Sequence, residues 1–521
     1  GKRGMARFAA GSGLLFSGSD WDFQMLSRAY DAIEAIAVED LHLDVYPVQI
    51  EIITAEQMLD VYSSIGMPLF YKHWSFGKHF AHHEAFYRKG LRGLAYEIVI
   101  NSSPCISYLM EENTATMQAL VIAHAAFGHN HFFKNNYLFK LWTDAEGILD
   151  YLNFAKSYVA RCEERYGHAA VERTLDAAHA LMSHGVHRYA GKKTPDLRDE
   201  EKRERERREY DEKIFNDLWR TVPTGHSKKN LDLDLERRRS LAGLPQENIL
   251  YFLEKMAPRL KPWQREIIRI VRHVAQYFYP QSQTKVMNEG TATYVHYRIM
   301  TRLHELGGIG DGDFLEFLKS HTNVVFQPTF NDPRYSGLNP YAIGFAMMQD
   351  IERIVTRPEE EDRQWFPDIA GTGDAMAVLR DLWANYRDES FVSQFLSPHL
   401  MRKMRMFQLT DDPEEEEGLR VAAIHDERGY RRIRRELARQ YDVGWIDPHI
   451  EIVDVDLAGD RRLLLKHTVL NGAMLDDMDA KRVLQHLADL WSYDVLMQEV
   501  DRSGAVLRDH LVHPRASALA A

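Results

Sequence analysis

The residues of this chain whose types and spacing could support chemistry are histidines and carboxylates in two short segments. The segment HAAFGHNH contains His124, His129 and His131. On an ideal α-helix His124 and His131 share a face because they are seven residues apart, whereas His129 lies about 140° from His124. Gly128 could end or distort the helix and turn His129 toward His124. The spacing therefore leaves open which pair of histidines converges.

The second segment, NEGTATYVH, contains Glu289 and His296, which are seven residues apart and fall on one helical face. Imidazole and carboxylate groups from two helices would supply nitrogen and oxygen ligands suited to Zn²⁺, Mn²⁺ or Fe²⁺, without any cysteine. We therefore predict a divalent metal site with His124, His129, Glu289 and His296 as ligands. Further pocket candidates are the neighbouring polar residues Asn130, His131 and Asn288.

A metal-activated water would also need a general base. The spacing in HAAFGH is not that of the H-E-x-x-H motif, which carries its own glutamate. The nearest carboxylates in the sequence are Glu111 and Glu112, which we predict as candidate catalytic bases. The aromatic-rich stretch 68–93 adds His73 and His79 as pocket candidates. The alternative interpretation of these histidines is structural, as hydrogen-bonded residues of the core.

The predicted site depends on helices and a hairpin. Met117, Leu120, Val121 and His124 follow a helical spacing in a helix that begins near residue 113 or 114. A second helix is predicted over residues 288–306. Two β-rich runs, 95–100 and 105–110, are separated by Asn, Ser, Ser and Pro and predict a β-hairpin. Glu111 and Glu112 come directly after it.

Composition excludes several classes of function. The 521 residues are 45% hydrophobic and 27% charged, which is typical of a globular protein of two or three domains. The net charge of −12 argues against a nucleic-acid partner, and two cysteines are too few for a disulfide framework. No run approaches the roughly 18 to 20 apolar residues of a membrane span. No phosphate-binding loop or dinucleotide motif occurs, so no nucleotide is expected.

We predict an α+β fold with a large, mainly helical N-terminal domain that includes the hairpin. This domain is expected in two parts, 19–190 and 246–400, separated by a charged insertion or linker at 191–245. The order of patterns over 401–505 predicts a C-terminal ferredoxin-like domain, β-α-β-β-α-β. Residues 1–18 are expected to form a flexible arm and 506–521 a tail.

Several segments together resemble the SpoVR family, the stage V sporulation protein R and its relatives. The matching segments include YPVQIEIITAEQMLDVYSSIGMP, HWSFGKHF, GLAYEIVINSSPCISYLMEENT, MQALVIAHAAFGHNHFFKNNYLF, QYFYPQSQTKVMNEGTATYVHY, GLNPYAIGF and AIHDERGYRRIRRELA. Two positions depart from the usual family pattern, Thr291 in place of Trp and His187 in place of Asp. The match runs from about Tyr46 to His467.

The resemblance implies a cytoplasmic bacterial protein linked to the spore cortex, the cell envelope or stress physiology. It also implies two partners, a PrkA-type serine protein kinase and a von Willebrand A-like protein, and it brings no enzymatic activity. Two functions follow as expectations. The first is a metal-dependent, hydrolase-like enzyme built on the histidines and glutamates, and the second is a non-enzymatic regulator or scaffold whose C-terminal domain binds partners.

Overall fold

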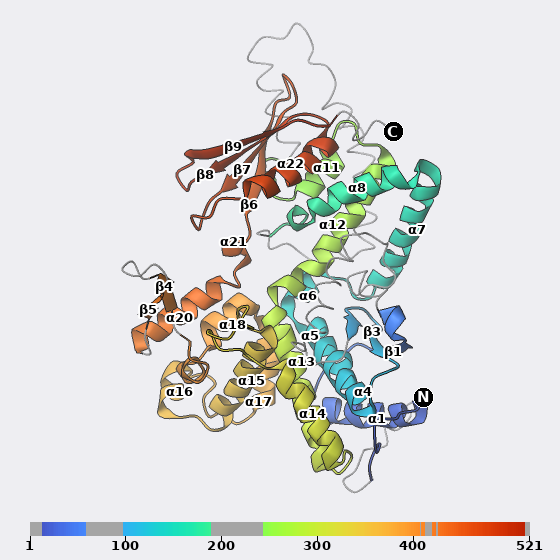
Figure 1. Cartoon of the computed structure of the whole chain (residues 1–521), viewed down its shortest axis with the longest axis vertical. Coiled ribbons are helices and arrows are strands. Elements are labelled where there is room, and N and C mark those ends of the chain that lie inside the picture. Colours follow the sequence, from blue (N-terminus) through green and yellow to red (C-terminus); the bar gives the residue numbers. More distant parts are fainter. Residues whose placement is uncertain are drawn as a thin grey trace.

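In the part of the chain that the structure describes, the fold is mainly helical, with three small β-sheets at different places in the molecule (Figure 1). The computed structural model describes residues 13–58, 97–188, 243–406, 408–411, 419–423 and 426–515. Two pocket candidates, His73 and His79, and almost all of the predicted insertion 191–245 lie outside the described residues. None of the helices in the described ranges combines the length and the apolar character needed to cross a membrane.

The first sheet lies beside the helices that carry the predicted site. Its strands are β1 (Val48–Ile53), β2 (Ile98–Ile100) and β3 (Cys105–Met110), with β3 in the middle. Strand β2 pairs antiparallel with β3, which confirms the predicted hairpin, and β1 pairs parallel with β3. The sheet thus holds residue 97, at the start of β2, next to the end of β3.

The two helices predicted around the site lie close to their expected positions, as α4 and α13. The helices up to residue 403 are α1 (Phe23–Ala35), η1 (Ile36–Asp40), α4 (Ala115–Val121), η2 (Ile122–His129), α5 (Asn130–Asn135), α6 (Tyr137–Trp142), α7 (Ile148–Tyr166), α8 (His168–Ala180), η3 (Met182–His184), α11 (Ile249–Met256), α12 (Pro262–Gln283), α13 (Lys285–Glu305), α14 (Asp311–Val324), α15 (Pro340–Thr356), α16 (Glu360–Trp365), α17 (Ala375–Asn385), α18 (Asp388–Phe395) and α19 (Pro398–Lys403).

Helix α13 lies between η2 and α15, and glycines allow the close approach on both sides. A Cβ on Gly128 would lie 2.7 Å from Ala292 Cα, and a Cβ on Gly290 would lie 2.7 Å from Gly344 Cα. A larger side chain at either glycine would therefore push backbones apart. These contacts place residue 289 of α13 directly against the histidine-bearing segment η2.

Buried apolar residues form two clusters. The first surrounds η2, α13 and α15, with α1, α17 and α18 packed around them. The second joins α7, α8, α11 and α12 to the C-terminal sheet, where the Phe252 and Trp491 ring centroids are 5.6 Å apart. Helix α12 runs from this second cluster toward the centre of the molecule, and α13 continues into the first (Figure 1). The C-terminal domain therefore shares its core with helices of the N-terminal part.

The C-terminal sheet contains β6 (His449–Val455), β7 (Leu463–Thr468), β8 (Val495–Val500) and β9 (Val506–Val512), in that order across the sheet. Helix α22 (Asp477–Trp491) connects β7 to β8, which are parallel, and the other neighbours are antiparallel. The α+β class is confirmed, and this domain of four strands and a helix fits a ferredoxin-like fold.

The elements of this domain differ from the predicted order. Helix α20 (Glu427–Arg439), predicted as its first helix, packs against α18, and its apolar residues join the first cluster. Strands β4 (Gln408–Asp411) and β5 (Leu419–Ala423) form a separate hairpin. The domain instead includes β9, which lies in the stretch expected to be a tail. Alternation alone does not reveal β9, because its outer positions are apolar.

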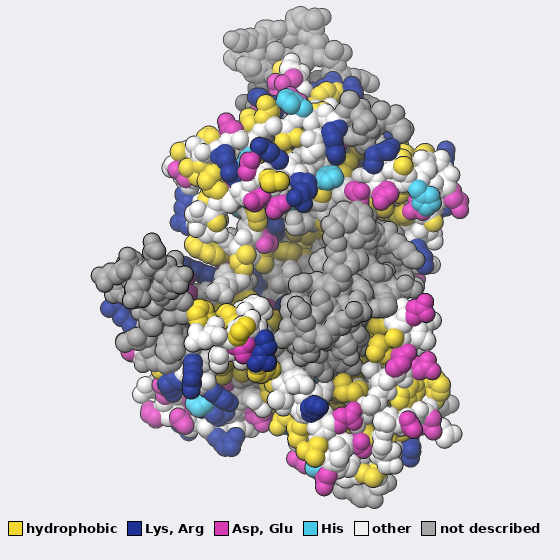
Figure 2. All heavy atoms as spheres, in the orientation of Figure 1, with side chains coloured by type: hydrophobic (Ala, Val, Ile, Leu, Met, Phe, Trp, Pro, Cys, Tyr) yellow, Lys and Arg dark blue, Asp and Glu magenta, His cyan; other side chains and the backbone are white. Residues whose placement is uncertain are grey.

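The expected flexible arm is also corrected where the structure describes it. Leu15 and Phe16 are buried in the first cluster, and Leu15 N donates a hydrogen bond to Gly308 O at 2.8 Å. Two apolar side chains were enough to anchor a segment that is otherwise rich in glycine and serine. On the face shown in Figure 2, apolar, basic and acidic side chains of the described residues are interspersed.

Candidate metal centre

The histidine-bearing segment changes its helical geometry where the histidines lie. Helix α4 begins at Thr114, whose side chain accepts a hydrogen bond from Met117 N at 3.2 Å. From Ile122 to His129 the chain forms the π-helix η2, with hydrogen bonds five residues apart, such as Asn130 N to Ala125 O. In a π-helix residues five apart lie one turn apart on the same side, and such turns are frequent at functional sites.

This geometry answers the question that the sequence left open. His124 and His129 converge, and their ring centroids are 4.8 Å apart. A regular α-helix would point them in different directions. The distortion predicted at Gly128 is therefore present, but it is a wider helix rather than an end, and it includes all eight residues from 122 to 129.

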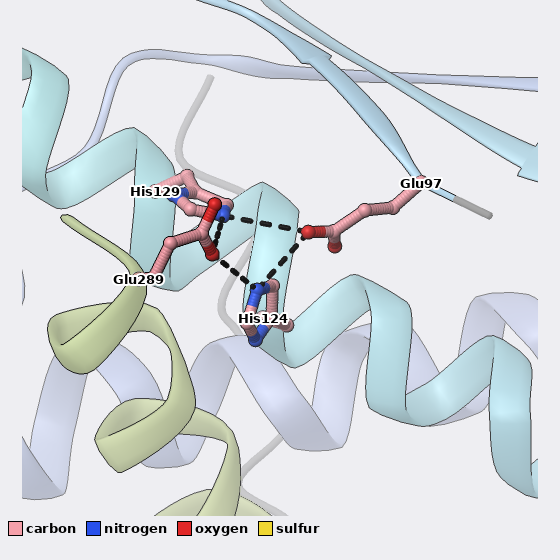
Figure 3. A group of neighbouring side chains, drawn as sticks. All are labelled: Glu97, His124, His129 and Glu289. Carbon is pink, nitrogen blue, oxygen red and sulfur yellow. Dashed lines mark ion pairs between the residues drawn. The ribbon is translucent and has the colours of Figure 1, made fainter. Parts of the chain in front are cut away.

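Two carboxylates face the two imidazoles (Figure 3). His124 Nε2 lies 3.0 Å from Glu97 Oε1 and 3.5 Å from Glu289 Oε2. His129 Nε2 lies 3.4 Å from each of the same two oxygens. One ligand atom from each of the four side chains lies within 4.8 Å of the others. The group unites the residue directly before strand β2, the π-helix and helix α13.

The two histidines of the centre are more deeply buried than the two glutamates. The side chains of His124 and His129 are 0% and 4% exposed, whereas those of Glu97 and Glu289 are 12% and 20% exposed. All four side chains are thus largely withdrawn from solvent, which strengthens the electrostatic interactions among them.

Charge pairing dominates the protonation of the four groups. Burial alone would raise the pKa of Glu289, but His129 and His124 outweigh it and hold this pKa well below its usual value. Burial likewise opposes charge on His129, yet Glu289 and Glu97 raise its pKa well above normal. The same balance lowers the pKa of Glu97 and raises that of His124. Each imidazole thus favours the charged form of the carboxylates, and each carboxylate favours the charged form of the imidazoles.

Hydrogen bonds behind the imidazoles orient them. His129 Nδ1 lies 2.8 Å from Asn288 Oδ1, which is an acceptor, so Nδ1 carries the proton. In the neutral ring, the lone pair of Nε2 then points at the carboxylates. His124 Nδ1 lies 2.8 Å from His296 Nδ1, and His296 Nε2 lies 2.9 Å from His321 Nδ1. Such supporting contacts are typical behind metal-binding histidines.

The structure brings together His124, His129 and Glu289 of the predicted ligands, but it places His296 differently. His296 lies behind His124, on the side of the ring away from the carboxylates. Its pKa is well below normal, because burial and then His124 disfavour its charged form. His296 is therefore a supporting group rather than a fourth ligand, since the seven-residue spacing shifts it along α13.

The remaining predicted residues lie outside the group of four. Glu111 and Glu112 are exposed in the turn after β3, and Glu112 Oε1 accepts a hydrogen bond from Ala55 N at 3.2 Å. Asn130 binds the backbone of Tyr46 through both ends of its amide. These contacts fix neighbouring segments of the backbone, and none of them reaches the centre.

His131 also has a structural position. Its Nδ1 accepts a hydrogen bond from Asp44 N at 2.9 Å, and burial lowers its pKa to about 4. Asn288, by contrast, contributes directly to the centre by orienting His129.

Glu97 is the residue that the sequence reasoning missed. It is the only charged residue in the run LAYEIVI, which otherwise has the composition of a buried strand. A carboxylate in such a run needs a partner, because an unpaired buried charge is costly. That signal was present, but the partner lies 27 residues later in His124, and only the fold shows the pairing.

The four side chains fit a mononuclear divalent metal site. Bonds of about 2.0 to 2.2 Å to a tetrahedral ion place its ligand atoms about 3.3 to 3.6 Å apart. The four nitrogen–oxygen distances of 3.0, 3.4, 3.4 and 3.5 Å lie close to this range. Among the described residues, the buried atoms His124 Nε2 and Glu289 Oε2 make no hydrogen bond of ordinary geometry. A cation at the common point would satisfy both.

Fold and site together define a mainly helical α+β protein with a buried cluster of two histidines and two glutamates. The family model described as "SpoVR like protein" matches residues 20–446, and the model described as "SpoVR-like C-terminal domain" matches residues 448–502. The chain therefore belongs to the SpoVR-like family.

A relative supports this assignment over almost the full length. The chain is 54% identical over 492 residues to the protein YcgB of Escherichia coli (strain K12), covering 94% of this chain and 95% of the relative. No solved structure matches the chain.

Proposed function

We propose that Glu97, His124, His129 and Glu289 bind one divalent metal ion, and that this centre gives the protein a hydrolase-like activity. The observation that carries the proposal is the convergence of two imidazole nitrogens and two carboxylate oxygens from three separate elements within 4.8 Å. Such mixed nitrogen and oxygen sets suit Zn²⁺, Mn²⁺ or Fe²⁺.

Charge balance supports a divalent cation. The two imidazoles lower the pKa of both carboxylates, which favours their negatively charged form. A divalent ion supplies two positive charges and allows both imidazoles to act as neutral ligands. One such ion therefore balances the two carboxylates, which avoids the cost of an unpaired buried charge.

The residues around the ion would divide the work. A bound divalent ion supplies a Lewis acid that polarises a substrate oxygen and lowers the pKa of water. Asn288 holds the ring of His129, and His296 holds the ring of His124. Each of Glu97 and Glu289 has a second carboxylate oxygen besides the one that faces the imidazoles, so we assign the role of proton acceptor from water to one of these two residues. This role replaces the one predicted for Glu112.

Metal analysis of protein purified without an affinity tag tests the proposal. We expect close to one divalent ion per chain in the wild type and large losses in Glu97→Gln and Glu289→Gln. The matched control is Glu112→Gln, which removes an exposed carboxylate outside the centre and should keep the metal. Equal metal content in all four proteins, or none in the wild type after growth with each candidate metal, would contradict the proposal.

Activity needs a separate measurement. The metal-loaded wild type is screened against ester, amide and phosphoester reporter substrates, with Glu97→Gln as the inactive reference. Hydrolysis that requires both the metal and Glu97 supports the hydrolase-like proposal. A stoichiometric metal without any turnover would leave a structural metal centre and refute the enzymatic part.

One feature of the C-terminal domain favours a second function, regulation through a protein partner. Strand β9 lies at the edge of the described sheet, and Val506, Leu507 and Leu511 on it are about half exposed, at 51%, 49% and 50%. An exposed strand edge can accept a strand from another chain. We propose the PrkA-type serine kinase as its partner, acting together with the von Willebrand A-like protein.

Co-purification of the full chain with the kinase tests whether the edge strand β9 binds this partner. Leu507→Lys combined with Leu511→Lys should abolish co-purification with the kinase, whereas Glu97→Gln should retain it. Retained binding by the double lysine variant would exclude this edge.

A further inference from the structure

Helix α20 forms one wall of a cavity that is distant in the sequence from the metal centre. The cavity has a volume of about 450 Å³ and includes the side chains of Arg431, Arg434, Arg435 and Arg439. The first three are spaced i, i+3 and i+4, so they share one face of the helix. Four guanidinium groups around one cavity are unusual in a chain with a net charge of −12.

The carboxylates that line the cavity do not neutralise these arginines. Glu389, from α18, forms its ion pair with Arg387 at 3.7 Å. Asp442 lies just after α20, and its Oδ1 accepts a hydrogen bond from Gly444 N at 3.0 Å. Outside the lining, Arg431 pairs with Glu427 at 3.3 Å and Arg439 with Glu436 at 3.1 Å. The positive charge that no ion pair offsets among the described residues therefore belongs to Arg434 and Arg435.

Among the four arginines, Arg434 has a buried positive charge that no carboxylate of the described residues offsets. It donates a hydrogen bond to the backbone carbonyl of Gln394, and its Nε is buried without any hydrogen bond among the described residues. No carboxylate in the described ranges forms an ion pair with it. Burial, and then the nearby Arg431, lower its pKa to about 10. A charge withdrawn from water in this way is costly unless an anion comes close.

Aromatic rings hold two of the guanidinium groups in place. The guanidinium carbons of Arg431 and Arg434 lie 4.7 and 5.4 Å from the centre of the Trp365 ring. Arg434 also lies 5.6 Å from the Phe366 ring centre. Stacked guanidinium groups keep their N–H donors in fixed directions, which suits paired hydrogen bonds to oxyanions. The arginines are thus arranged before any ligand arrives.

We propose that this cavity is a binding site for a small oligophosphate group, either free or as part of a nucleotide. Its volume is that of a small-molecule site and is too small for a nucleic-acid duplex. Several guanidinium groups on one side favour a ligand with several negative charges over a single carboxylate. The proposal is independent of the metal centre, because the two sites share no residue.

Calorimetric titration of the full chain with inorganic pyrophosphate tests the site. The protein is first freed of divalent metal, so that chelation by pyrophosphate gives no signal. We expect saturable binding, and a loss of affinity of about tenfold or more in Arg431→Gln combined with Arg435→Gln. Arg428→Gln combined with Arg432→Gln is the matched control, because it removes the same charge from the same helix outside the cavity.

Further titrations identify the class of ligand and show whether binding in this cavity is independent of the metal centre. Tripolyphosphate and adenosine triphosphate distinguish a free oligophosphate from a nucleotide, and citrate tests whether any multivalent anion suffices. Glu97→Gln should bind pyrophosphate as the wild type does, even if the metal proposal fails. The inference is overturned by absence of binding at roughly 1 mM, by equal losses in both double variants, or by equal affinity for citrate.

Discussion

Individual side chains orient the imidazoles of the proposed metal centre. Asn288 accepts a hydrogen bond from His129 Nδ1, and His296 lies behind His124 in a chain of imidazoles that ends at His321. Groups behind metal-binding histidines commonly change metal affinity by 10- to 100-fold, about as strongly as some ligands do. Asn288 directly precedes the proposed ligand Glu289 in the sequence, but its side chain orients a different proposed ligand, His129.

At Asn288, substitution by alanine should weaken metal binding by about 10- to 100-fold without unfolding the protein. The reason is that His129 loses the acceptor that fixes its ring and its tautomer. Competition with a metal chelator measures the affinity. Asn288→Asp keeps an acceptor oxygen and should retain most of it, so equal loss in both variants would argue against an orienting role.

A second buried carboxylate, Glu499, controls the acid stability of the C-terminal domain. Burial alone would raise its pKa, but a hydrogen bond from Leu475 N at 2.8 Å and contacts from Arg508, His510 and His467 lower it to about 2. Because this pKa lies below that of the unfolded chain, about 4.5, the carboxylate contributes stability above pH 4.5 and loses it as the pH falls toward 2.

When the pH is lowered from 5 to 3, protonation of Glu499 should reduce the free energy of unfolding by about 2 kcal/mol. Denaturant unfolding of the wild type and of Glu499→Gln at both pH values measures the difference. The variant should be less stable at pH 7 by about 3 kcal/mol, because the neighbouring arginine and histidines lose their acceptor. It should also change less with pH, and an equal pH dependence in both proteins would rule out Glu499 as the source.

At the scale of elements, the π-helix η2 determines whether a centre exists. It places His124 and His129 one turn apart. It also lies directly against α13, because Gly128 has no side chain that would separate the two helices. The energetic cost of the wider helix is compensated by tight packing against Ala292 and by the carboxylates that both histidines meet. Geometry of this kind depends on the neighbouring helix as much as on the local sequence.

Replacement of Gly128 by alanine should destabilise the protein by about 3 kcal/mol and reduce its metal content. The new Cβ would lie 2.7 Å from Ala292 Cα, which cannot move without shifting α13 and Glu289. Gly312→Ala in α14 is the control, because its Cβ would meet nothing within 4 Å. That control should be neutral or stabilising by up to about 1 kcal/mol in thermal unfolding. Similar losses in both variants would contradict the packing argument.

At the scale of the whole molecule, each of the two apolar clusters combines residues from the predicted N-terminal and C-terminal domains. The C-terminal sheet and α22 share a cluster with α8, α11 and α12, and α20 belongs to the other cluster. The proposed metal centre lies with the first cluster, whereas Glu499 lies in the sheet that contributes to the second. We therefore expect the C-terminal domain and α11 to α12 to unfold together.

Truncation of Trp491 to alanine should lower stability by about 4 kcal/mol and increase hydrogen exchange in both α22 and α11. The indole is fully buried, and its ring centroid lies 5.6 Å from that of Phe252 in α11. Met478→Ala, at a side chain of the same helix that is 75% exposed, should change little. Faster exchange confined to α22 would show that the C-terminal domain unfolds on its own.

Much of the architecture follows from local patterns. Alternation and turn residues predict the hairpin of the runs 95–100 and 105–110, and apolar spacing predicts the helix that begins near residue 113 or 114. Strand β9 and helix α20 were misassigned for different reasons. The pattern of β9 lacks alternation, whereas the core that α20 joins depends on contacts with distant elements.

The sequence by itself determined the residue types of the candidate centre, because histidine and glutamate in apolar helices require partners wherever the chain folds. Only the tertiary structure decided which residues meet. In the folded chain Glu97, which directly precedes strand β2, lies next to His124. A π-helix directs His129 toward His124, and His296 lies in a supporting position. The physical reason is that a site depends on distances between elements, and those are set by packing that no local spacing contains.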